Sequence, residues 1–146
     1  MGNRGFGSWK QGGASENRKV RGAVKVIMEG GIKADSKLEA YMHERLRGLG
    51  IEFEFHRWFE LQEGFEWRES KIRAIRWCVD FYFPWCDVVV DTKGFITEKA
   101  DLKMKLFKYR YRRTMVLLPS NRDGVDREVL YLLGLWTQHQ NIIKNG

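Results

Sequence analysis

The sequence predicts an α/β fold, in which helices pack on one mixed sheet of parallel and antiparallel strands. Segments in which apolar and polar residues alternate, as in strands, are interspersed with segments whose apolar residues recur every three or four positions, as in helices. Their order along the chain is β, α, several β, α, β, α. The chain has 146 residues, of which 43% are hydrophobic. This length and composition predict one domain with a substantial core.

The first elements of the chain are short. Residues 1–20 are rich in glycine, asparagine, serine and charge, and we expect a flexible basic arm there. Residues 21–146 are expected to form a single domain. Within it, AVKVIME predicts a short strand and the following Gly-Gly pair a turn. ADSKLEAYMHERLRGLG then predicts a helix with Ser36 as its N-cap.

Residues 51–93 are expected to supply most of the sheet. IEFEFHRWFELQE predicts one or two strands, GFEWRES a loop, KIRAIRWCVDFYF one long strand and VVVDTK another. The four residues PWCD between the last two strands predict a hairpin turn. With this turn Phe83 faces Val88, and Asp80 then lies directly opposite Asp91.

The last third of the chain predicts a helix, a strand and a helix. TEKADLKMKLFKYRYRR predicts a basic helix and TMVLLP a short buried strand. The segment from Asp126 to Asn145 predicts a C-terminal helix. Its apolar stripe consists of Leu130, Leu133, Trp136 and Ile143. The stripe is expected to pack on the protein's own sheet or, as an alternative, to form a dimer interface.

The predicted hairpin has two different faces, because side chains alternate along a strand. The apolar face, expected to be the core face, carries Trp77, Val79, Phe81, Phe83, Val88, Val90 and Thr92. The other face carries Cys78, Asp80, Tyr82, Val89, Asp91 and Lys93.

The two aspartates are therefore predicted to be cross-strand neighbours, with Cβ atoms about 4.5–5.5 Å apart. Like charges so placed destabilise a sheet, and a divalent cation between Asp80 and Asp91 would offset the repulsion. Lys93 on the same face would neutralise part of the charge. The alternative is a solvated face with scattered charges. Glu39 is a third candidate carboxylate, although the run from Ser36 to Glu39 also matches a capping box.

The charge balance favours a polyanionic partner. Lysine and arginine outnumber aspartate and glutamate by 26 to 19, which gives a net charge of +7. The candidate nucleic-acid-binding residues are Lys99, Lys103, Lys105, Lys108 and Arg110. They would follow a phosphate backbone with salt-sensitive, largely sequence-independent affinity, unless they form only a solvated helix face. Trp85, at the hairpin tip, is a candidate to stack on a base or wedge into a junction.

Several other classes of protein are not indicated. The two cysteines show neither a disulfide framework nor zinc spacing, which fits a reducing cytoplasm. The apolar runs are too short to span a membrane, and we expect no secretion signal and no membrane partner. The pair His43-Glu44 begins a zinc motif that Arg47 breaks. His56 and His139 are isolated in the sequence, so no histidine site is expected.

One motif resembles a known superfamily. Asp80 with Asp91-Thr92-Lys93 resembles the D…(D/E)-x-K signature of the restriction-endonuclease-like, or PD-(D/E)xK, nucleases. An upstream helical glutamate, like Glu39, is usual there. Two departures are Val79 in place of proline before the first aspartate, and an aspartate as the second acid where glutamate is commoner.

A longer resemblance covers about residues 24–110. The stretches GIKADSKLEAYMHERL, FELQEGF, VDFYF and VVVDTKGFITEKADLKMKLFKY resemble a family of small phage-encoded proteins grouped with these nucleases. Some of its members are labelled Holliday junction resolvases. The resemblance implies a restriction-endonuclease-like core, α-β-β-β-α-β, to which the C-terminal helix is an addition.

The resemblance also implies a function. It implies a Mg²⁺-dependent endonuclease that hydrolyses phosphodiester bonds in DNA, branched DNA such as Holliday junctions above all, with Mn²⁺ as a substitute. Asp80, Asp91 and Glu39 would hold the metal, and Lys93 would assist the attacking water. Such a protein would serve DNA recombination in the cytoplasm of an infected bacterial host, and paired cuts would favour a homodimer. The alternative is a non-catalytic nucleic-acid-binding phage protein on the same fold. RNA as the substrate, and one metal ion or two, remain open alternatives.

Overall fold

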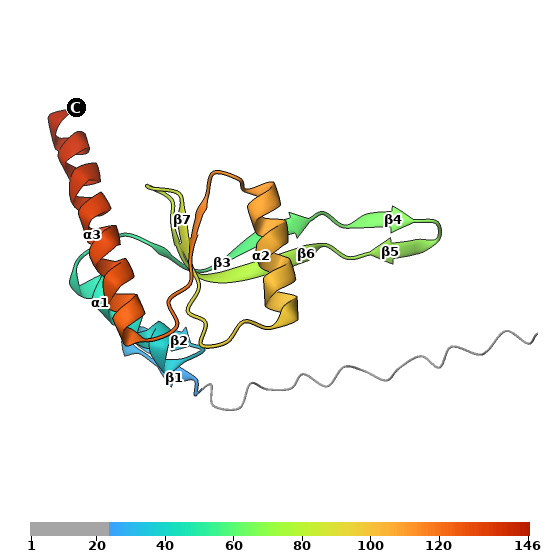
Figure 1. The fold of residues 1–146 in the computed structure, drawn as a ribbon, viewed down its shortest axis with the longest axis horizontal. Helices are drawn as coiled ribbons and strands as arrows, with labels where there is room; N and C mark the ends of the chain where they lie inside the picture. The colour runs from blue at the N-terminus through green and yellow to red at the C-terminus, as the bar shows by residue number, and fades with distance from the viewer. Residues whose placement is uncertain (1–23) are drawn as a thin grey trace, which may run out of the picture.

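The computed structural model describes residues 24–146, and the expected arm at residues 1–20 lies outside them. The elements are β1 (Val26–Ile27), the 3-10 turn η1 (Glu29–Gly31), β2 (Lys33–Ala34), α1 (Lys37–Gly48), β3 (Glu54–Gln62), β4 (Phe65–Trp67), β5 (Ser70–Ile72), β6 (Ile75–Phe83), β7 (Val88–Val90), α2 (Glu98–Arg110), β8 (Met115–Leu117) and α3 (Arg122–Asn145) (Figure 1). The described part of the chain is a mixed α+β structure with three α-helices and a mixed sheet. The predicted fold class is thereby confirmed.

The main sheet has four strands in the order β3-β6-β7-β8. β6 pairs antiparallel with β3 and with β7, and β7 pairs parallel with β8. A parallel pair needs a long crossover connection, which α2 provides. The three valines of β7 are all buried, as expected for a strand that is covered on both faces.

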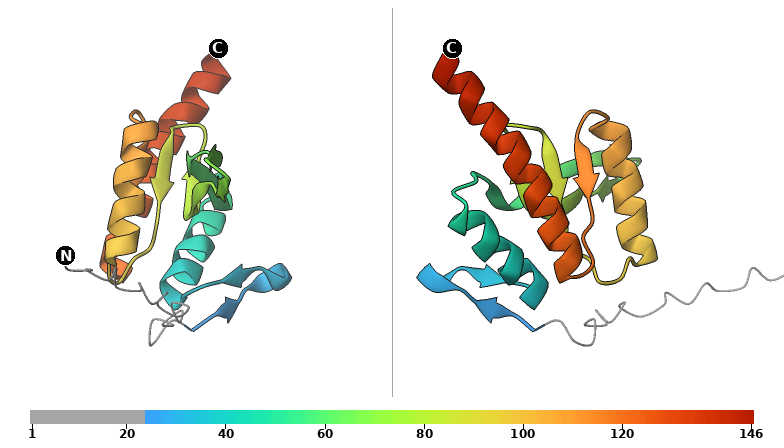
Figure 2. Two further views of the ribbon diagram at one scale, coloured as in Figure 1. Left: turned by 90° about the vertical axis from the view of Figure 1, so that its right-hand side faces the viewer. Right: turned by 60° about the vertical axis from the view of Figure 1, so that its left-hand side comes forward.

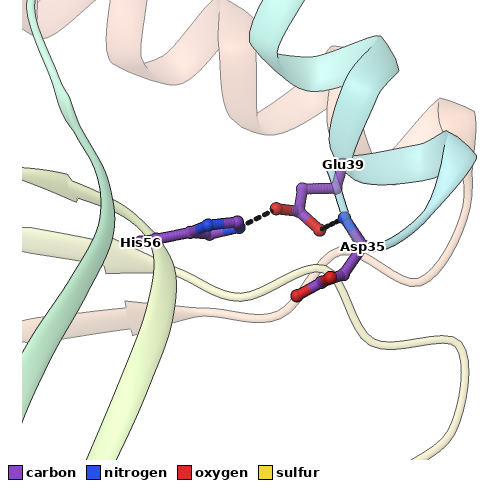
Figure 3. A group of neighbouring side chains, drawn as sticks. All are labelled: Asp35, Glu39 and His56. Atoms are coloured by element: carbon purple, nitrogen blue, oxygen red, sulfur yellow. Dashed lines mark hydrogen bonds and ion pairs between the residues drawn. The ribbon is translucent and has the colours of Figure 1, made fainter. Parts of the chain in front are cut away.

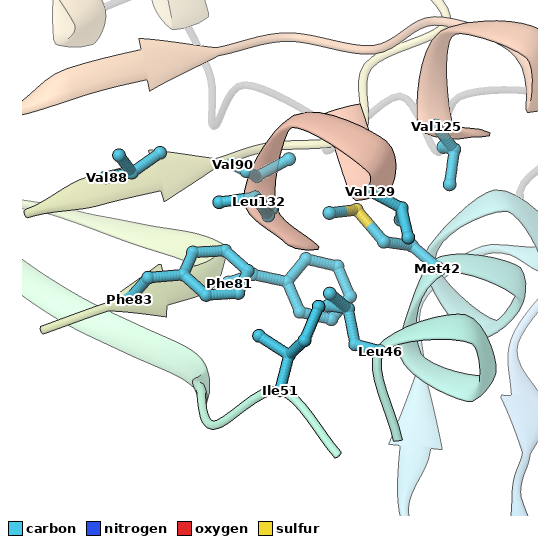
Figure 4. Packing of buried hydrophobic residues seen from close by; sticks show 10 residues of the cluster. All are labelled: Met42, Leu46, Ile51, Phe81, Phe83, Val88, Val90, Val125, Val129 and Leu132. Atoms are coloured by element: carbon cyan, nitrogen blue, oxygen red, sulfur yellow. The ribbon is translucent and has the colours of Figure 1, made fainter. Parts of the chain in front are cut away.

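Helices cover both faces of this sheet (Figure 2). On one face, α1 and α3 enclose a core that includes Met42, Leu46, Val129 and Leu132 (Figure 4). On the other face, α2 packs Met104 and Phe107 against the sheet, with Phe59, Trp77 and Val79. The aromatic rings meet edge to face, for example Trp77 and Phe107, whose centroids are 5.2 Å apart.

The expected single core face of the hairpin is wrong in one respect. Its aromatic and aliphatic residues are all buried, but they belong to two cores on opposite sides of the sheet. Trp77 and Val79 pack in the α2 core, whereas Phe81 and Phe83 pack in the core of α1 and α3. The cause is that a twisted strand between two helical layers presents successive parts of one face to different layers.

The loop expected at GFEWRES is also wrong. Phe65–Trp67 and Ser70–Ile72 form a second antiparallel hairpin, which projects beyond the main sheet (Figure 1). The predicted long strand is accordingly split into β5 and β6. The turn takes a left-handed residue, Arg68 with φ +56°. Because this turn lacks the usual glycine or asparagine, its sequence gives no hairpin signal.

Half of the apolar stripe expected on α3 is confirmed, because Leu133 and Trp136 are partly buried against the core. Val125, Val129 and Leu132 are the buried residues of this helix, whereas Leu130 and Ile143 are exposed. The C-terminal half of α3 extends past the sheet, so it has less to pack against (Figure 1). No helix of residues 24–146 is long and apolar enough to cross a membrane.

A matched pair of leucines tests the position of α3. Leu132 is 0% exposed and Leu130 is 63% exposed. We expect Leu132→Ala to lower the free energy of unfolding by about 2–5 kcal/mol, because it leaves a cavity. Leu130→Ala should change it by less than about 0.5 kcal/mol. Urea denaturation of both variants measures the difference, and equal losses would contradict this packing.

Candidate functional site

The structure brings the two aspartates together as the sequence predicts. The turn after β6 pairs Phe83 with Val88 and continues through Tyr82–Val89 to Phe81–Val90. The paired residues end there; Asp80 and Asp91 are the next residue on each strand, near enough for the charge of Asp91 to act on Asp80. The predicted hairpin is therefore confirmed in both its turn and its register.

Asp91 is the most unusual side chain of the site. It is 0% exposed, and its backbone N–H donates to the Leu117 carbonyl at 3.0 Å, which ties it to β8. Lys93 Nζ lies 2.9 Å from Oδ2, within ion-pair distance. Among residues 24–146, however, neither carboxylate oxygen of Asp91 accepts a hydrogen bond of acceptable geometry. Such a buried carboxylate is costly unless a further partner satisfies it.

Asp80 is held by its neighbour across the hairpin. Its Oδ2 accepts hydrogen bonds from the N–H and from the hydroxyl of Thr92, both at 2.7 Å. Burial above all, and then the charges of Asp91 and Glu39, raise the pKa of Asp80 to about 7 against the smaller opposing effect of the two hydrogen bonds. Thr92 was expected on the core face of the hairpin. It instead orients a site carboxylate, a role that its place in the sequence does not reveal.

Glu39 serves both as part of the helix cap and as part of the site. Its N–H donates to the Ser36 hydroxyl at 3.1 Å, which confirms the predicted N-cap. Its side chain is 2% exposed, with Oε1 in contact with His56 Nε2 and Oε2 accepting from the Asp35 N–H at 2.9 Å (Figure 3). Burial raises the pKa of Glu39 against the opposing effect of His56.

His56 is the site residue that sequence reasoning missed, and the expectation that it is isolated is wrong. It lies 17 residues from Glu39, but β3 pairs with β6 so that His56 stands level with Asp80. Its φ of +56° is left-handed, which is uncommon for a residue other than glycine. Such strain persists where the surrounding structure holds it and clusters at functional sites.

One pocket of about 830 Å³ is lined by Glu39, His56, Asp80, Thr92 and Lys93, among others. Asp91, which is fully buried, does not line it. Burial alone would lower the pKa of Lys93. Attraction by Asp91, Asp80 and Glu39 outweighs it, so the net shift is upward. Lys93 is thus an ammonium ion at neutral pH. Cys78 also lines the pocket, but burial and nearby carboxylates raise its pKa to about 11, so it is a protonated thiol.

The residues of the pocket fit a divalent cation. Asp80, Asp91 and Glu39 offer the hard oxygen atoms that Mg²⁺ and Mn²⁺ bind, but within residues 24–146 these three do not bring their oxygens together as a set of ligand atoms within 4.8 Å of one another. Asp35, Glu39 and His56 can each place one ligand atom within 4.8 Å of the others. An imidazole nitrogen in the donor set favours Mn²⁺ over Mg²⁺.

The predicted basic residues of α2 differ in their surroundings. Lys99 and Lys103 line a second hollow beside Lys93. Lys105 instead pairs with Asp101 at 2.7 Å. Arg110, at the far end of the helix, lies 3.4 Å from Glu60. Lys108 is exposed. Only the first two lysines therefore border the acidic pocket.

Trp85, at the hairpin tip, is held by contacts within the protein. Its Nε1–H donates to the Glu52 carbonyl at 2.8 Å, and its ring packs on Trp136 at 4.9 Å between centroids. Trp85 stays partly exposed, so its role with a nucleic acid stays a prediction. The sequence places Trp85 at a hairpin tip, which is usually exposed, but in the structure α3 lies beside this tip.

Fold and site define a mixed α+β protein with a buried acidic pocket next to two lysines. A family model matches residues 18–119, more than two thirds of the chain, and its description is "Protein of unknown function (DUF1064)". The chain belongs to this family. All of the pocket residues named above lie in the matched segment, whereas α3 lies beyond it. No curated protein matches the chain, and neither does any solved structure.

Titration of Asp80 should govern the stability of the metal-free protein. Its folded pKa of about 7 exceeds the ordinary 3.8, so the bound proton stabilises the fold fully below about pH 4, and this stabilisation is lost as the pH rises through 7. In EDTA, the free energy of unfolding of Asp80→Asn should therefore rise relative to that of the wild type when the pH is raised from 5 to 8. Urea denaturation at both values measures the gain. A stability difference between Asp80→Asn and the wild type that is the same at both pH values would contradict the shift.

Metal binding can be measured without any activity. An ion that binds the folded state stabilises it, by about 2.7 kcal/mol at 100 times its Kd. We expect Mn²⁺ to raise the melting temperature of the wild type at lower concentrations than Mg²⁺, because the imidazole of His56 favours Mn²⁺. His56→Gln should narrow the gap between the two ions, because it removes the nitrogen donor. Asp91→Asn should abolish both shifts. A melting temperature that neither ion changes in the wild type would rule out this site.

Proposed function

We propose that the protein is a metal-dependent endonuclease that hydrolyses phosphodiester bonds in DNA. One observation carries the proposal: Asp91 is fully buried, the Lys93 ammonium is the one charged partner of its carboxylate in the described chain, and Asp91 follows directly on the β6–β7 pairing, as Asp80 does on the other strand. Glu39 and Lys93 belong to the same site. A purely structural carboxylate would be expected to find hydrogen-bond donors.

The topology supports a restriction-endonuclease-like core. The main elements follow the order α1, β3, β6, β7, α2, β8, which is the α-β-β-β-α-β order that the resemblance implies. The acidic pair stands where the central antiparallel pair β6–β7 ends, and Lys93 comes two residues after the second acid.

Each side chain has a role in the proposed reaction. Asp80, Asp91 and Glu39, with His56, would hold the cation, which when bound polarises the phosphate and lowers the pKa of a coordinated water. Thr92 orients Asp80 through its two hydrogen bonds. Because Lys93 is protonated, it would not act as a base. It would instead donate to the attacking water or to a phosphate oxygen, as an ammonium point charge does.

The proposed substrate is DNA with a branch, such as a Holliday junction. The net charge of +7 and the two lysines beside the pocket support a polyanion. A homodimer would place two sites for paired cuts, and the cytoplasm of an infected bacterium would supply recombining DNA. Both extend the proposal from the phage resemblance.

A cleavage assay on labelled substrates tests the function. The panel contains a four-way junction, a flap, a plain duplex, single-stranded DNA and RNA, each with Mg²⁺ or Mn²⁺. We expect paired cuts in the junction, and a loss of about 100-fold or more in Asp91→Asn, because a site group that stabilises the transition state is removed. Asp123→Asn, on the first turn of α3, is the matched control and should cut normally.

The other outcomes are informative as well. Equal cutting of every DNA would indicate a general nuclease and refute the junction preference. No cutting with either ion, together with tight binding, would refute the enzyme and favour the non-catalytic binding protein. Unchanged cutting in a folded Asp91→Asn protein would refute this site.

A further inference from the structure

Trp58 is an exposed indole ring at the edge of the acidic pocket. It is 62% exposed, although tryptophan is a residue that folding normally covers. On β3 it stands opposite Cys78 of β6, two pairs along the ladder from the level of His56 and Asp80. Two residues along a strand span roughly 7 Å. An indole ring is thus open to the solvent beside the candidate metal ligands.

The acidic pocket continues past Trp58 toward α2. Trp58, Cys78 and Lys93 line both the acidic pocket and a second hollow of about 260 Å³. Thr97, Lys99 and Lys103 line the far part of the second hollow. The two hollows therefore form one groove with carboxylates at one end and lysines at the other, and Trp58 lies where they meet.

The lysines of this groove differ from their neighbours on α2. Within residues 24–146, neither Lys99 nor Lys103 forms an ion pair, whereas Lys105 on the same helix pairs with Asp101. Burial lowers the pKa of Lys103, and the nearby charges of Lys99 and Lys93 lower it further. Positive charges crowded in this way lack a counterion, and a chain of phosphates would supply one.

An exposed tryptophan next to these lysines distinguishes between double and single strands. In a duplex, the faces of the bases are stacked on one another, so an aromatic ring could not stack on them, although phosphates and the base edges in the grooves stay accessible. An unpaired base offers its free face to an aromatic ring, and such stacking tolerates every sequence. The pairing of one indole with two lysines therefore fits an unpaired nucleotide segment better than it fits a duplex.

We propose that Trp58 stacks on an unpaired base next to the phosphate to be cut, while Lys99 and Lys103 hold the adjoining phosphates. This inference rests on the proposed nuclease function and specifies its substrate: the strand in the groove is single-stranded, as at a flap or an opened branch point. Trp58 is thereby a specificity-determining residue for strand structure.

The test measures binding without cleavage. Fluorescence anisotropy in EDTA follows a labelled single-stranded oligonucleotide and a blunt duplex of the same length. Trp58→Leu keeps an apolar side chain but removes the ring, and we expect it to weaken single-strand binding roughly 5- to 100-fold. Trp58→Phe keeps an aromatic ring and should stay within about threefold of the wild type. Duplex binding should change less than about twofold in either variant.

Trp67 is the matched control for the ring. It is 58% exposed, but it lies on the projecting β4–β5 hairpin, away from the groove. Trp67→Leu should bind single strands as the wild type does. An equal loss in Trp67→Leu, or no loss in Trp58→Leu, would overturn the proposal. Both tryptophans are exposed, so both variants should keep the melting temperature of the wild type.

The lysines are tested through the salt dependence of binding. Each phosphate contact with a single strand contributes about 0.7 to the slope of log K against log salt. The double variant Lys99→Gln/Lys103→Gln should lower the slope by about 1.4. The control Lys105→Gln/Lys108→Gln, on the same helix, should leave it nearly unchanged. Equal changes in both double variants would overturn the assignment of phosphates to the groove.

These outcomes are separate from those of the cleavage assay, because EDTA removes the cation that cutting requires. If binding depends on Trp58 but nothing is cut, the nuclease proposal fails and the single-strand groove stands. If the protein cuts DNA but Trp58→Leu binds single strands normally, only the groove proposal fails.

Discussion

The pairing of β6 with β7 is the constraint on which the rest of the site depends. A turn of four residues fixes the register, and a slip by one residue would send one aspartate to the opposite face of the sheet. The slip is opposed because all three valines of β7 are buried and because the Asp91 N–H bonds to Leu117 on β8. The apolar packing of the hairpin therefore holds two carboxylates together that would otherwise repel each other.

Several neighbouring groups offset the free-energy cost of placing these buried carboxylates close together. Thr92 compensates Asp80 with two hydrogen bonds, and Lys93 compensates Asp91 with its charge. Glu39 is compensated by a helix N-terminus and by His56, whose backbone is itself in a left-handed conformation. Residues that lower stability locally while the remainder of the fold retains them are typical of functional sites. A bound cation would relieve the same repulsion and would thereby link metal binding to stability.

The groove combines three elements that are distant in the sequence. α1 supplies Glu39, β3 supplies His56 and Trp58, and the start of α2 supplies Lys99 and Lys103. Acidic and basic groups thus meet in one depression, with Lys93 between them. This separation suits a phosphodiester substrate. Lysines at one end can hold the backbone next to the reacting phosphate, while the carboxylates at the other end stay free to hold the metal.

The sequence by itself determined the local features of this protein. The alternation of side chains and the four-residue turn were enough to place Asp80 opposite Asp91, and the S-x-x-E pattern was enough to place the cap of α1, because each depends on neighbours within a few residues. Only the tertiary structure brought His56 to Glu39, turned Leu132 rather than Leu130 to the core and partly covered Trp85 while leaving Trp58 open. These outcomes depend on how helices and strands pack at long range, and spacing along the chain does not encode the distances between packed elements.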